Sequence, residues 1–426
     1  MKVIYPKTLI LIVNFNPMGS GITVRNLFYN WPKSKLANAS LQVIEDRTIC
    51  DLYYTLHTSQ FPIVNRINND DKEIASQIID RNSVANGFKK KLLIGFKNFL
   101  EQKYIINKIK IDGNLIKWIS SHKFDLLYAI PSTAKDIPFL IRLKKLTNLP
   151  LAVHIFDDWV EHNRFGYFKI IFKPLLEHDF KKLLKIADLK IAICEDMKIA
   201  YEKRYKAQFY YFHNPAHDTA NLSSIDKERV PNSIEILFIG TIGEHNIDLF
   251  VALGHAIDVL QSEKIKIKLR FFGYISKPFI LGVLDTINGL EINKPLDNHQ
   301  IPEILANSDI LLLPLSFSKS QKNYIQYSMP TKVSEYLASG VPILVMAPDK
   351  YALTNYAVKG QWAFVVSEIN VNKLVTAIKE LIFNDKLRAQ IVSNAQNEFY
   401  SKHRIEGVSE SFRDTLSTII ANEYSS

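Results

Sequence analysis

The sequence predicts an α/β protein made of two doubly wound parallel-sheet domains in tandem. Short continuous apolar runs alternate with helical segments along the chain, which is typical of strands that are buried on both faces. A polar stretch over 213–232 interrupts this alternation, which then restarts. The length of 426 residues suits two or three ordinary domains.

The first half contains four predicted strands and two predicted helices. The strands cover 8–14, 125–130, 151–156 and 189–194, and the helices cover 23–31 and 196–206. The apolar run over 9–13 is too short to span a bilayer, and no small-residue cleavage site follows it. We therefore expect a buried strand there and no export.

The second half repeats the alternation with five predicted strands, over 234–239, 264–272, 309–314, 341–346 and 364–366. A helix is expected over 331–338, and an amphipathic helix at 408–420. The predicted organisation is thus a Rossmann-like domain over 1–215, a linker over 216–232, a second Rossmann-like domain over 233–403, and a final segment over 404–426.

Composition narrows the compartment and the partners. Two cysteines, Cys50 and Cys194, support neither a disulfide framework nor a cysteine zinc site, which fits a reducing, cytoplasmic setting. Up to residue 232 there are 35 basic and 23 acidic side chains, while the remainder carries 18 and 20. This asymmetry indicates an anionic partner for the first half, or else a general basic bias of the proteome.

The segment 87–118 has a character of its own. It carries eight lysines against Glu101 and Asp112, with apolar residues recurring every three or four positions. Such a basic amphipathic helix suits the anionic surface of a membrane. The alternative is a surface helix whose lysines face only water.

Several chemistries lack their signatures. The sequence has no GxxxxGK[ST], no HExxH, no GxSxG and no strict GxGxxG after the first strand. His213 and His217 are four apart, but Pro215 between them disrupts a helical metal pair. No aromatic stacking platform accompanies the lysines, so we expect no nucleic-acid partner.

The strongest local signal lies over 327–342. Pro330 and Thr331 indicate a helix start with Thr331 as the N-cap, and Gly340 indicates its end. The free N–H groups of the first turn, together with Lys332, could bind an anion, and Glu335 could accept hydrogen bonds from ribose hydroxyls. An ordinary capped helix in an αβ unit remains the alternative.

The run PTKVSEYLASGVPIL over 330–344 resembles the donor-binding signature of GT-B glycosyltransferases of the retaining family 4 type, which includes bacterial sugar transferases. The preceding run over 301–314 is similar to a helix and strand of that family. This resemblance implies two domains facing a cleft, with the C-terminal helix crossing back to the first domain. It also implies a donor site with Gly240, Thr241, Gly243, Tyr327, Ser328, Thr331, Lys332 and Glu335.

In the first half the resemblance is to an acceptor-side loop and a central catalytic loop. It implies acceptor contacts at Gly19, Ser20 and Gly21, and catalytic roles for His154, Asp157 and Asp158. From the residues alone, the glycines could form only a tight turn, and His154 could be a packed core histidine. The two aspartates could serve the acceptor as base or hydrogen-bond partner, bind a metal, or cap a helix at 159–162.

The sequence departs from the family at two points. Tyr327 stands where the family commonly has a glutamate that contacts the donor sugar. Glu244, His245 and Asn246 follow the glycine loop, where an arginine or lysine is common. Lys332 and the helix start are then expected to supply the positive field, with Lys319 and Lys322 as further candidates.

The resemblance implies a hexosyltransferase-like glycosyltransferase (EC 2.4) that acts with retention of configuration. Its donor would be a nucleotide sugar, with neither metal nor other cofactor. Its acceptor would be a polysaccharide or lipid-linked glycan of the cell envelope, reached from the cytoplasm or the inner face of the plasma membrane. The alternatives are a sugar-nucleotide 2-epimerase of the same fold and a non-catalytic nucleotide-sugar-binding partner in a glycan assembly complex.

Overall fold

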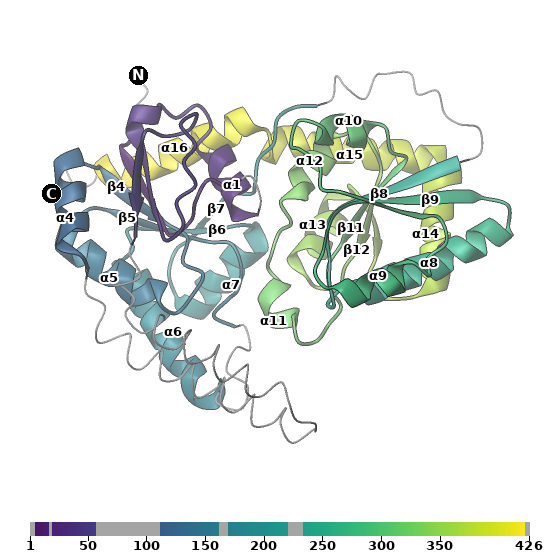
Figure 1. Ribbon diagram of the computed structural model, residues 1–426, viewed down its shortest axis with the longest axis horizontal. Coiled ribbons are helices and arrows are strands. Elements are labelled where there is room, and N and C mark those ends of the chain that lie inside the picture. The colour runs from purple at the N-terminus through teal and green to yellow at the C-terminus, as the bar shows by residue number, and fades with distance from the viewer. Residues whose placement is uncertain (1–4, 17–18, 57–110, 162–168, 220–232, 422–426) are drawn as a thin grey trace. The chain divides into compact units, whose positions relative to one another are not determined.

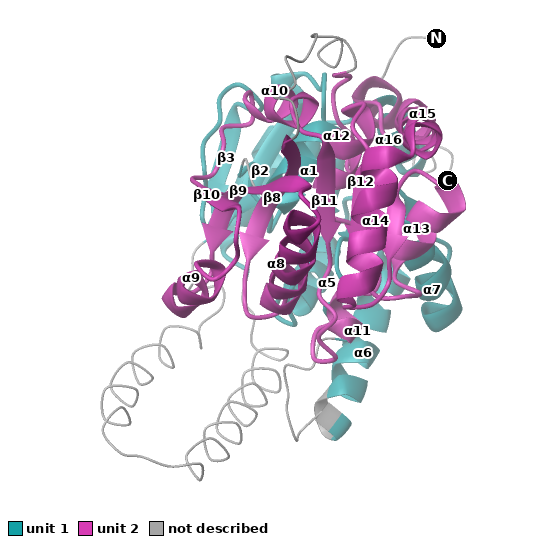
Figure 2. Ribbon diagram, turned by 90° about the vertical axis from the view of Figure 1, so that its right-hand side faces the viewer, with its two compact units in different colours: residues 1–212, 410–426 teal, residues 213–409 magenta. Residues whose placement is uncertain are grey.

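Parallel strands and their covering helices build two units, one of residues 1–212 and 410–426 and one of residues 213–409 (Figure 2). The computed structural model describes residues 5–16, 19–56, 111–161, 169–219 and 233–421. Most of the predicted linker 216–232 and most of the basic segment 87–118 therefore lie outside the described residues.

The first unit is a seven-stranded parallel sheet in the order β3-β2-β1-β4-β5-β6-β7. Figure 1 labels β4, β5, β6 and β7 of this sheet. Four strands have every residue buried, as strands covered on both faces require. The strands are β1 (Thr8–Leu11), β2 (Leu36–Ser40), β3 (Leu52–Thr55), β4 (Leu126–Ala129), β5 (Leu151–Ile155), β6 (Leu189–Ala192) and β7 (Tyr210–Tyr211).

Helices cover both faces of this sheet because the strand order runs in two directions from β1. Right-handed crossovers place α1, which leads to β2, opposite α5 and α6, which lead to β5 and β6. Phe412 packs against Phe28 and Tyr128, so the end of α16 covers the face of α1. The helices are α1 (Ser20–Leu27), η1 (Lys33–Lys35), α4 (Gly113–His122), α5 (Asp136–Thr147), α6 (Lys169–Ile186) and α7 (Glu195–Tyr205).

The second unit is a six-stranded parallel sheet in the order β10-β9-β8-β11-β12-β13. Its strands are β8 (Ser233–Ile242), β9 (Lys266–Ile275), β10 (Leu290–Asn293), β11 (Ile310–Pro314), β12 (Ile343–Met346) and β13 (Phe364–Val366). Its helices are α8 (Ile247–Ser262), α9 (Pro278–Leu284), α10 (Ile301–Ala306), α11 (Lys322–Ile325), α12 (Lys332–Ala338), α13 (Ala352–Gly360), α14 (Val371–Phe383), α15 (Asp385–Lys402) and the first part of α16 (Ile405–Ala421).

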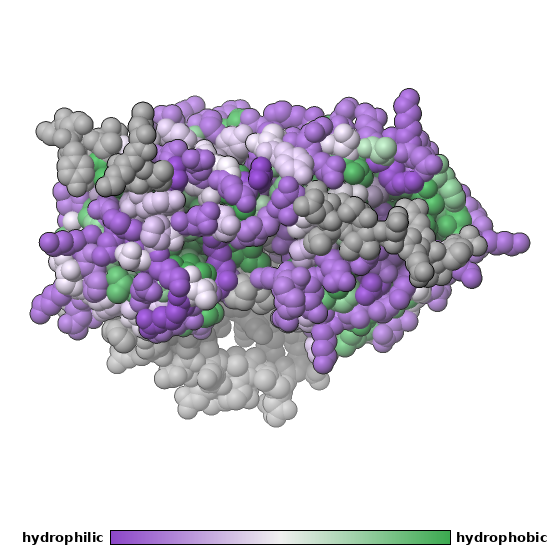
Figure 3. All heavy atoms as spheres, turned by 90° about the horizontal axis from the view of Figure 1, so that it is seen from above, coloured by the Kyte–Doolittle hydropathy of each residue, from purple (hydrophilic) through white to green (hydrophobic). Residues whose placement is uncertain are grey.

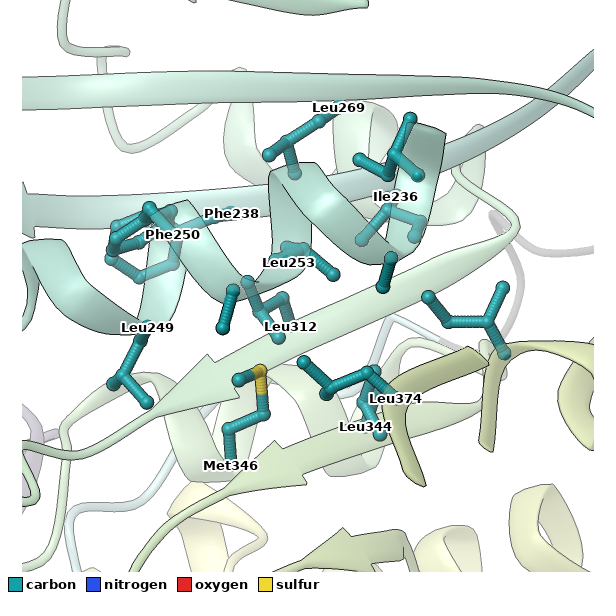
Figure 4. Close-up of a cluster of buried hydrophobic side chains, with 14 of the residues drawn as sticks. Ile236, Phe238, Leu249, Phe250, Leu253, Leu269, Leu312, Leu344, Met346 and Leu374 are labelled. Carbon is teal, nitrogen blue, oxygen red and sulfur yellow. The ribbon is translucent and has the colours of Figure 1, made fainter. Parts of the chain in front are cut away.

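A hydrophobic cluster joins one face of this second sheet to α8 and α14 (Figure 4). Leu312 and Leu344 come from the two central strands, Leu253 from α8 and Leu374 from α14, and all four are fully buried or nearly so. Burying a leucine contributes roughly 1.5–3 kcal/mol, so the contacts of this layer hold both helices against the sheet. Helices α12 and α15 pack against each other, and the buried Tyr336 of α12 reaches the Ile239 backbone of β8.

Two parallel-sheet α/β domains are as the sequence predicted, but strand bounds differ. Strand β8 continues to Ile242, so Gly240 and Thr241 lie within it rather than in the loop that was predicted to begin at Gly240. Gly240 pairs with Gly273 of β9, whose φ is +154°. A Cβ on Gly273 would lie only 1.7 Å from the carbonyl oxygen of Gly240, so the two strands can extend this far only with glycine there.

Side chains on the face seen in Figure 3 are mostly hydrophilic, with smaller separate hydrophobic areas. Scattered apolar residues are normal on a protein surface. The larger exposed ones include Ile170 and Leu175 on α6 and Phe279 on α9.

We predict that Gly273→Ala destabilises the second unit by about 1–3 kcal/mol, because the new methyl group must displace the Gly240 carbonyl. Urea unfolding followed by circular dichroism measures the loss. Gly282→Ala is the control, because a Cβ there meets nothing within 4 Å and α9 gains helix propensity. Equal stability of the two variants would contradict the close approach.

Candidate functional site

The order of the second sheet reverses between β8 and β11. From β8 the chain continues to β9 on one side, and from β11 it continues to β12 on the other side. The loops that follow β8 and β11 therefore begin next to each other at the carboxyl edge of the sheet and then diverge. Ligands of doubly wound sheets bind at this position, outside the carboxyl ends of the strands. In this chain the two loops are 243–246 and 315–321.

Side chains tie the two loops to each other through His245. The hydroxyl of Ser316 donates to the His245 carbonyl oxygen. The amide nitrogen of Gln321 lies 3.2 Å from Nε2 of the same histidine. Sequence reasoning named His245 only as one of the residues that stand where the family commonly has an arginine or lysine. It did not select Ser316 or Gln321. The signal that could have found them is their position in the loops that follow two predicted buried strands.

The first of these loops is also closed internally. Asn246 accepts from the backbone N–H of Gly243 at 2.7 Å and donates to the Thr241 carbonyl at 3.1 Å. The predicted donor residues Gly240, Thr241 and Gly243 therefore belong to one connected strand end, and Gly243 is the residue at which the chain leaves the sheet.

Helix α12 begins on the connection that follows β11, at the same edge. Thr331 directly precedes it, as predicted, but its backbone is already helical (φ −59°, ψ −25°) and its side chain makes no capping hydrogen bond. The predicted side-chain cap is therefore wrong. The residues at this helix start, Pro330 to Lys332, are half-buried rather than covered.

Lys332 and Glu335 lie in the first turn of α12 and face each other. Lys332 Nζ is 3.0 Å from Glu335 Oε2, and both side chains are largely buried. This oxygen is buried and accepts no hydrogen bond of good geometry from the residues that the structure describes. The pair thus presents a carboxylate with spare acceptor capacity beside a positive charge.

Tyr327 and Ser328 lie between α11 and α12 and are half-buried. The Ser328 hydroxyl donates to the Tyr324 carbonyl at 3.3 Å, and its N–H donates to the Ile325 carbonyl at 3.0 Å. Ser328 therefore closes the end of α11 in this structure.

In the first unit the predicted acceptor residues Gly19, Ser20 and Gly21 stand at the start of α1, after β1. The sheet order reverses between β1 and β4, so this loop also lies at a switch point. A Cβ on Gly21 would lie 2.1 Å from the Asn16 carbonyl oxygen, so close backbone packing alone requires glycine there.

His154 is fully buried in the middle of strand β5. Its Nδ1 lies 2.7 Å from the Tyr128 hydroxyl, and its ring packs edge-on against Phe156 and tilted against Phe412. Burial lowers the pKa of His154 to about 3, so the imidazole is neutral at physiological pH. These contacts are the ones expected of a packed core histidine, which is one of the two alternatives that the sequence allowed for His154.

Asp158 is also fully buried, and its partners fill both carboxylate oxygens. Arg204 binds it through two hydrogen bonds of 2.9 Å, and the Tyr201 hydroxyl donates a third of 2.9 Å. Burial opposes the charge of Arg204, but the hydrogen bonds and charge of Asp158 outweigh it and raise the arginine pKa above its ordinary value. Residues 159–161 form a turn rather than the start of a helix, while Asp157 is half-buried beside it.

Comparison with known proteins finds a family match within the second unit. Residues 233–384 match the family model described as Glycosyl transferases group 1. The match begins with β8 and ends directly after α14, so the matched segment contains both switch-point loops and α12. Among curated proteins, none matches the sequence.

Solved structures show the same GT-B fold along the whole chain. HepE from Anabaena, crystallised with UDP and glucose, is 14% identical, with a TM-score of 0.62 over 97% of this chain and 100% of its own. Sucrose-phosphate synthase from Thermosynechococcus elongatus is 13% identical, with a TM-score of 0.65 over 97% and 99%. A glycosyltransferase from Rickettsia africae is 14% identical, with a TM-score of 0.61 over 97% and 99%.

Two further observations concern the described part of the chain, inside and outside the group 1 domain. No three His, Cys, Asp or Glu side chains gather there as a metal site would require. None of the helices described combines the length and apolar character needed to cross a bilayer.

We predict that His154 makes the first unit acid-sensitive. Its folded pKa of about 3 lies below the unfolded value near 6.5, so only the unfolded chain gains a proton as the pH falls between these values. The resulting loss from pH 7 to 5.5 is about 1 kcal/mol. His154→Gln should remove this part of the pH dependence in urea unfolding, whereas His178→Gln on the exposed face of α6 should not. An unchanged slope in His154→Gln would contradict the buried neutral state.

Proposed function

We propose that this chain transfers a sugar from a nucleotide-activated donor to a glycan or lipid-linked glycan acceptor, with retention of configuration. One observation carries the proposal. The group 1 match covers residues 233–384, in which two switch-point loops and the Lys332–Glu335 pair lie at the carboxyl edge of one sheet. A family match and an independent geometric expectation for ligand binding thus select the same edge.

In the proposed donor site, Glu335 accepts hydrogen bonds from the ribose hydroxyls. Support comes from the Glu335 side chain, which is 27% exposed and can therefore be reached by ribose hydroxyls, while its buried Oε2 faces Lys332. Lys332 is proposed to face the diphosphate, with Thr331 beside it and Gly243 at the point where the chain leaves β8. Tyr327 and Ser328 complete the site on the donor side.

The proposed chemistry follows from the charge that the leaving group gains. A nucleoside diphosphate departs with growing negative charge on its oxygens, and donors fixed near those oxygens stabilise the transition state more than the ground state. The ammonium of Lys332 is a fixed positive charge of this kind. Its pairing with Glu335 holds it in place before the donor arrives, because both lie in one helical turn.

Uridine diphosphate is the first nucleotide to test. HepE was crystallised with UDP and with UDP-glucose, and a trehalose-6-phosphate protein of Escherichia coli was crystallised with UDP-2-fluoro glucose. These neighbours are only 12–14% identical to this chain, so the base and the sugar are part of the proposal.

The acceptor is proposed to bind the first unit, at the switch-point loop of Gly19 to Gly21. We place the enzyme at the inner face of the plasma membrane. Support comes from the described helix α6, whose exposed side chains include Lys181, Lys182 and Lys185 at one end and Ile170 and Leu175 at the other. Basic and apolar side chains on one helix suit an anionic lipid surface.

We predict that Glu335→Gln and Lys332→Ala each weaken UDP binding about tenfold, measured by isothermal titration calorimetry. Each change removes one charge-assisted contact, worth about 1.5–3 kcal/mol. Lys373→Ala is the matched control, because it removes an exposed ion pair with Glu368 in the same unit. If both site variants bind UDP with wild-type affinity, the assignment of Lys332 and Glu335 to the donor site is wrong.

Product analysis then separates the proposed reaction from its two alternatives. A donor incubated without acceptor yields an epimerised nucleotide sugar if the chain is a 2-epimerase. A non-catalytic binding protein yields neither epimer nor transferred sugar, although it binds the nucleotide. Only a glycosyltransferase releases nucleoside diphosphate in proportion to the sugar that an added glycan gains.

We predict that Lys181→Ala combined with Lys185→Ala weakens binding to vesicles of phosphatidylcholine and phosphatidylserine. Each lysine near an anionic surface contributes about 1 kcal/mol, so the pair should cost roughly thirtyfold in co-sedimentation. The control combines Lys266→Ala with Lys386→Ala, two exposed lysines of the second unit. Equal losses in the two double variants, or binding that a DNA oligonucleotide competes away, would contradict a membrane role for α6.

A further inference from the structure

We propose that Asn214 is a positioning residue for the donor site, because it fixes the first turn of α12 to the chain segment that enters the second unit. The inference rests on the proposed function, since Lys332 and Glu335 of that turn are proposed to hold the nucleotide. Asn214 itself is a buried side chain that touches the turn, not a group assigned to any ligand.

The contact is a pair of hydrogen bonds from one amide group. Asn214 Nδ2 donates to the Thr331 carbonyl oxygen at 2.8 Å and to the Ser334 hydroxyl oxygen at 3.2 Å. Ser334 is buried as well, and its hydroxyl lies 3.3 Å from the same carbonyl. Because a backbone carbonyl only accepts hydrogen bonds, the nitrogen of the amide must face α12.

The residues that carry these two acceptors directly precede the two residues proposed to bind the nucleotide. Thr331 is followed by Lys332, and Ser334 is followed by Glu335. Helix α12 has only seven residues, about two turns, so its axis follows whatever holds its ends. A shift at the first turn would therefore move the ammonium and the carboxylate together.

The segment that carries Asn214 is itself held firmly within the second unit. Ala216 forms an isolated parallel bridge with Arg404, with backbone hydrogen bonds to His403 and Ile405 of 2.9 and 3.0 Å. The Asn214 carbonyl lies 3.3 Å from His403 Nδ1. Asn214 therefore anchors the first turn of α12 to a backbone segment that is itself held in place.

A second hydrogen bond in the same cluster provides a comparison. The Tyr356 hydroxyl lies 2.6 Å from His403 Nε2, and His213 stacks on the Tyr356 ring at 5.0 Å. This contact belongs to α13 rather than α12, and it shares His403 with the Asn214 segment. Removing it disturbs the entering segment without releasing the first turn of α12.

The experiment measures affinity and turnover for Asn214→Asp, Asn214→Ala and the control Tyr356→Phe. The aspartate keeps the shape but places a carboxylate against the Thr331 carbonyl, while the alanine removes the amide. We expect the Asn214 variants to raise the Kd for UDP and the donor KM about five- to tenfold, with kcat changed less than twofold. Tyr356→Phe should lower the melting temperature to a similar extent but leave the Kd for UDP unchanged.

Three results would overturn the inference, and each is distinct. If the wild-type chain binds UDP and the Asn214 variants bind it equally well, Asn214 does not position the site. If Tyr356→Phe weakens binding as much as the Asn214 variants do, the role is only structural. If the wild-type chain binds no nucleoside diphosphate in a panel of all common bases, the proposed donor site is wrong, and the positioning role fails with it.

Should Asn214→Asp not fold, Ser334→Ala serves in its place because it removes one of the two acceptors. An unchanged Kd for UDP in both Ser334→Ala and Asn214→Ala would contradict the positioning role.

Discussion

The reversal of strand order between β8 and β11 is the constraint on which the candidate site depends. Strands buried on both faces leave a parallel sheet no polar surface except at its ends. At a reversal, the loops from neighbouring strands diverge to opposite faces, so their backbone groups remain open at that edge. In this chain the Ser316 hydroxyl and the Gln321 amide link the two loops through His245.

Burial then decides which charged groups can act and which only support. The charge of Asp158 is neutralised by Arg204 and its oxygens are occupied, so separating the pair would cost several kcal/mol. Glu335 differs because its ion-pair partner, Lys332, lies one helical turn away, and no well-aligned hydrogen bond from the described residues reaches its Oε2. Two carboxylates that look alike in the sequence therefore have different functions available to them. Asp158 holds α7 against the loop after β5, and the role proposed for Glu335 is recognition.

The sequence predicted the two-domain fold because most of its nine expected strands are predominantly apolar runs, and burial on both faces requires such runs. It did not predict β2, whose centre is Asn38, because a buried polar residue in a strand has no signature until its partner is known. That partner is the Val13 carbonyl, 25 residues away in the sequence and 2.7 Å away in space. The same reason hides His245, Gln321 and Asn214, whose contacts come from segments far apart along the chain. The motif at 330–344 was visible because all of its residues are consecutive.

The entry into the second unit shows how such distant contacts can link fold and function. The chain passes from the first unit into the second at residue 213 and returns at residue 410. Near these two passages, Ala216 and Arg404 pair directly, so the entering segment and the start of the returning helix are fixed to one place in the second unit. The side chain of Asn214 donates its hydrogen bonds to the first turn of α12 rather than to the chain near residue 213 or residue 410. A buried amide costs free energy unless it is satisfied, and a purely structural linker could satisfy its backbone without one. The choice of α12 as its partner is therefore best explained by the need to hold that one turn still.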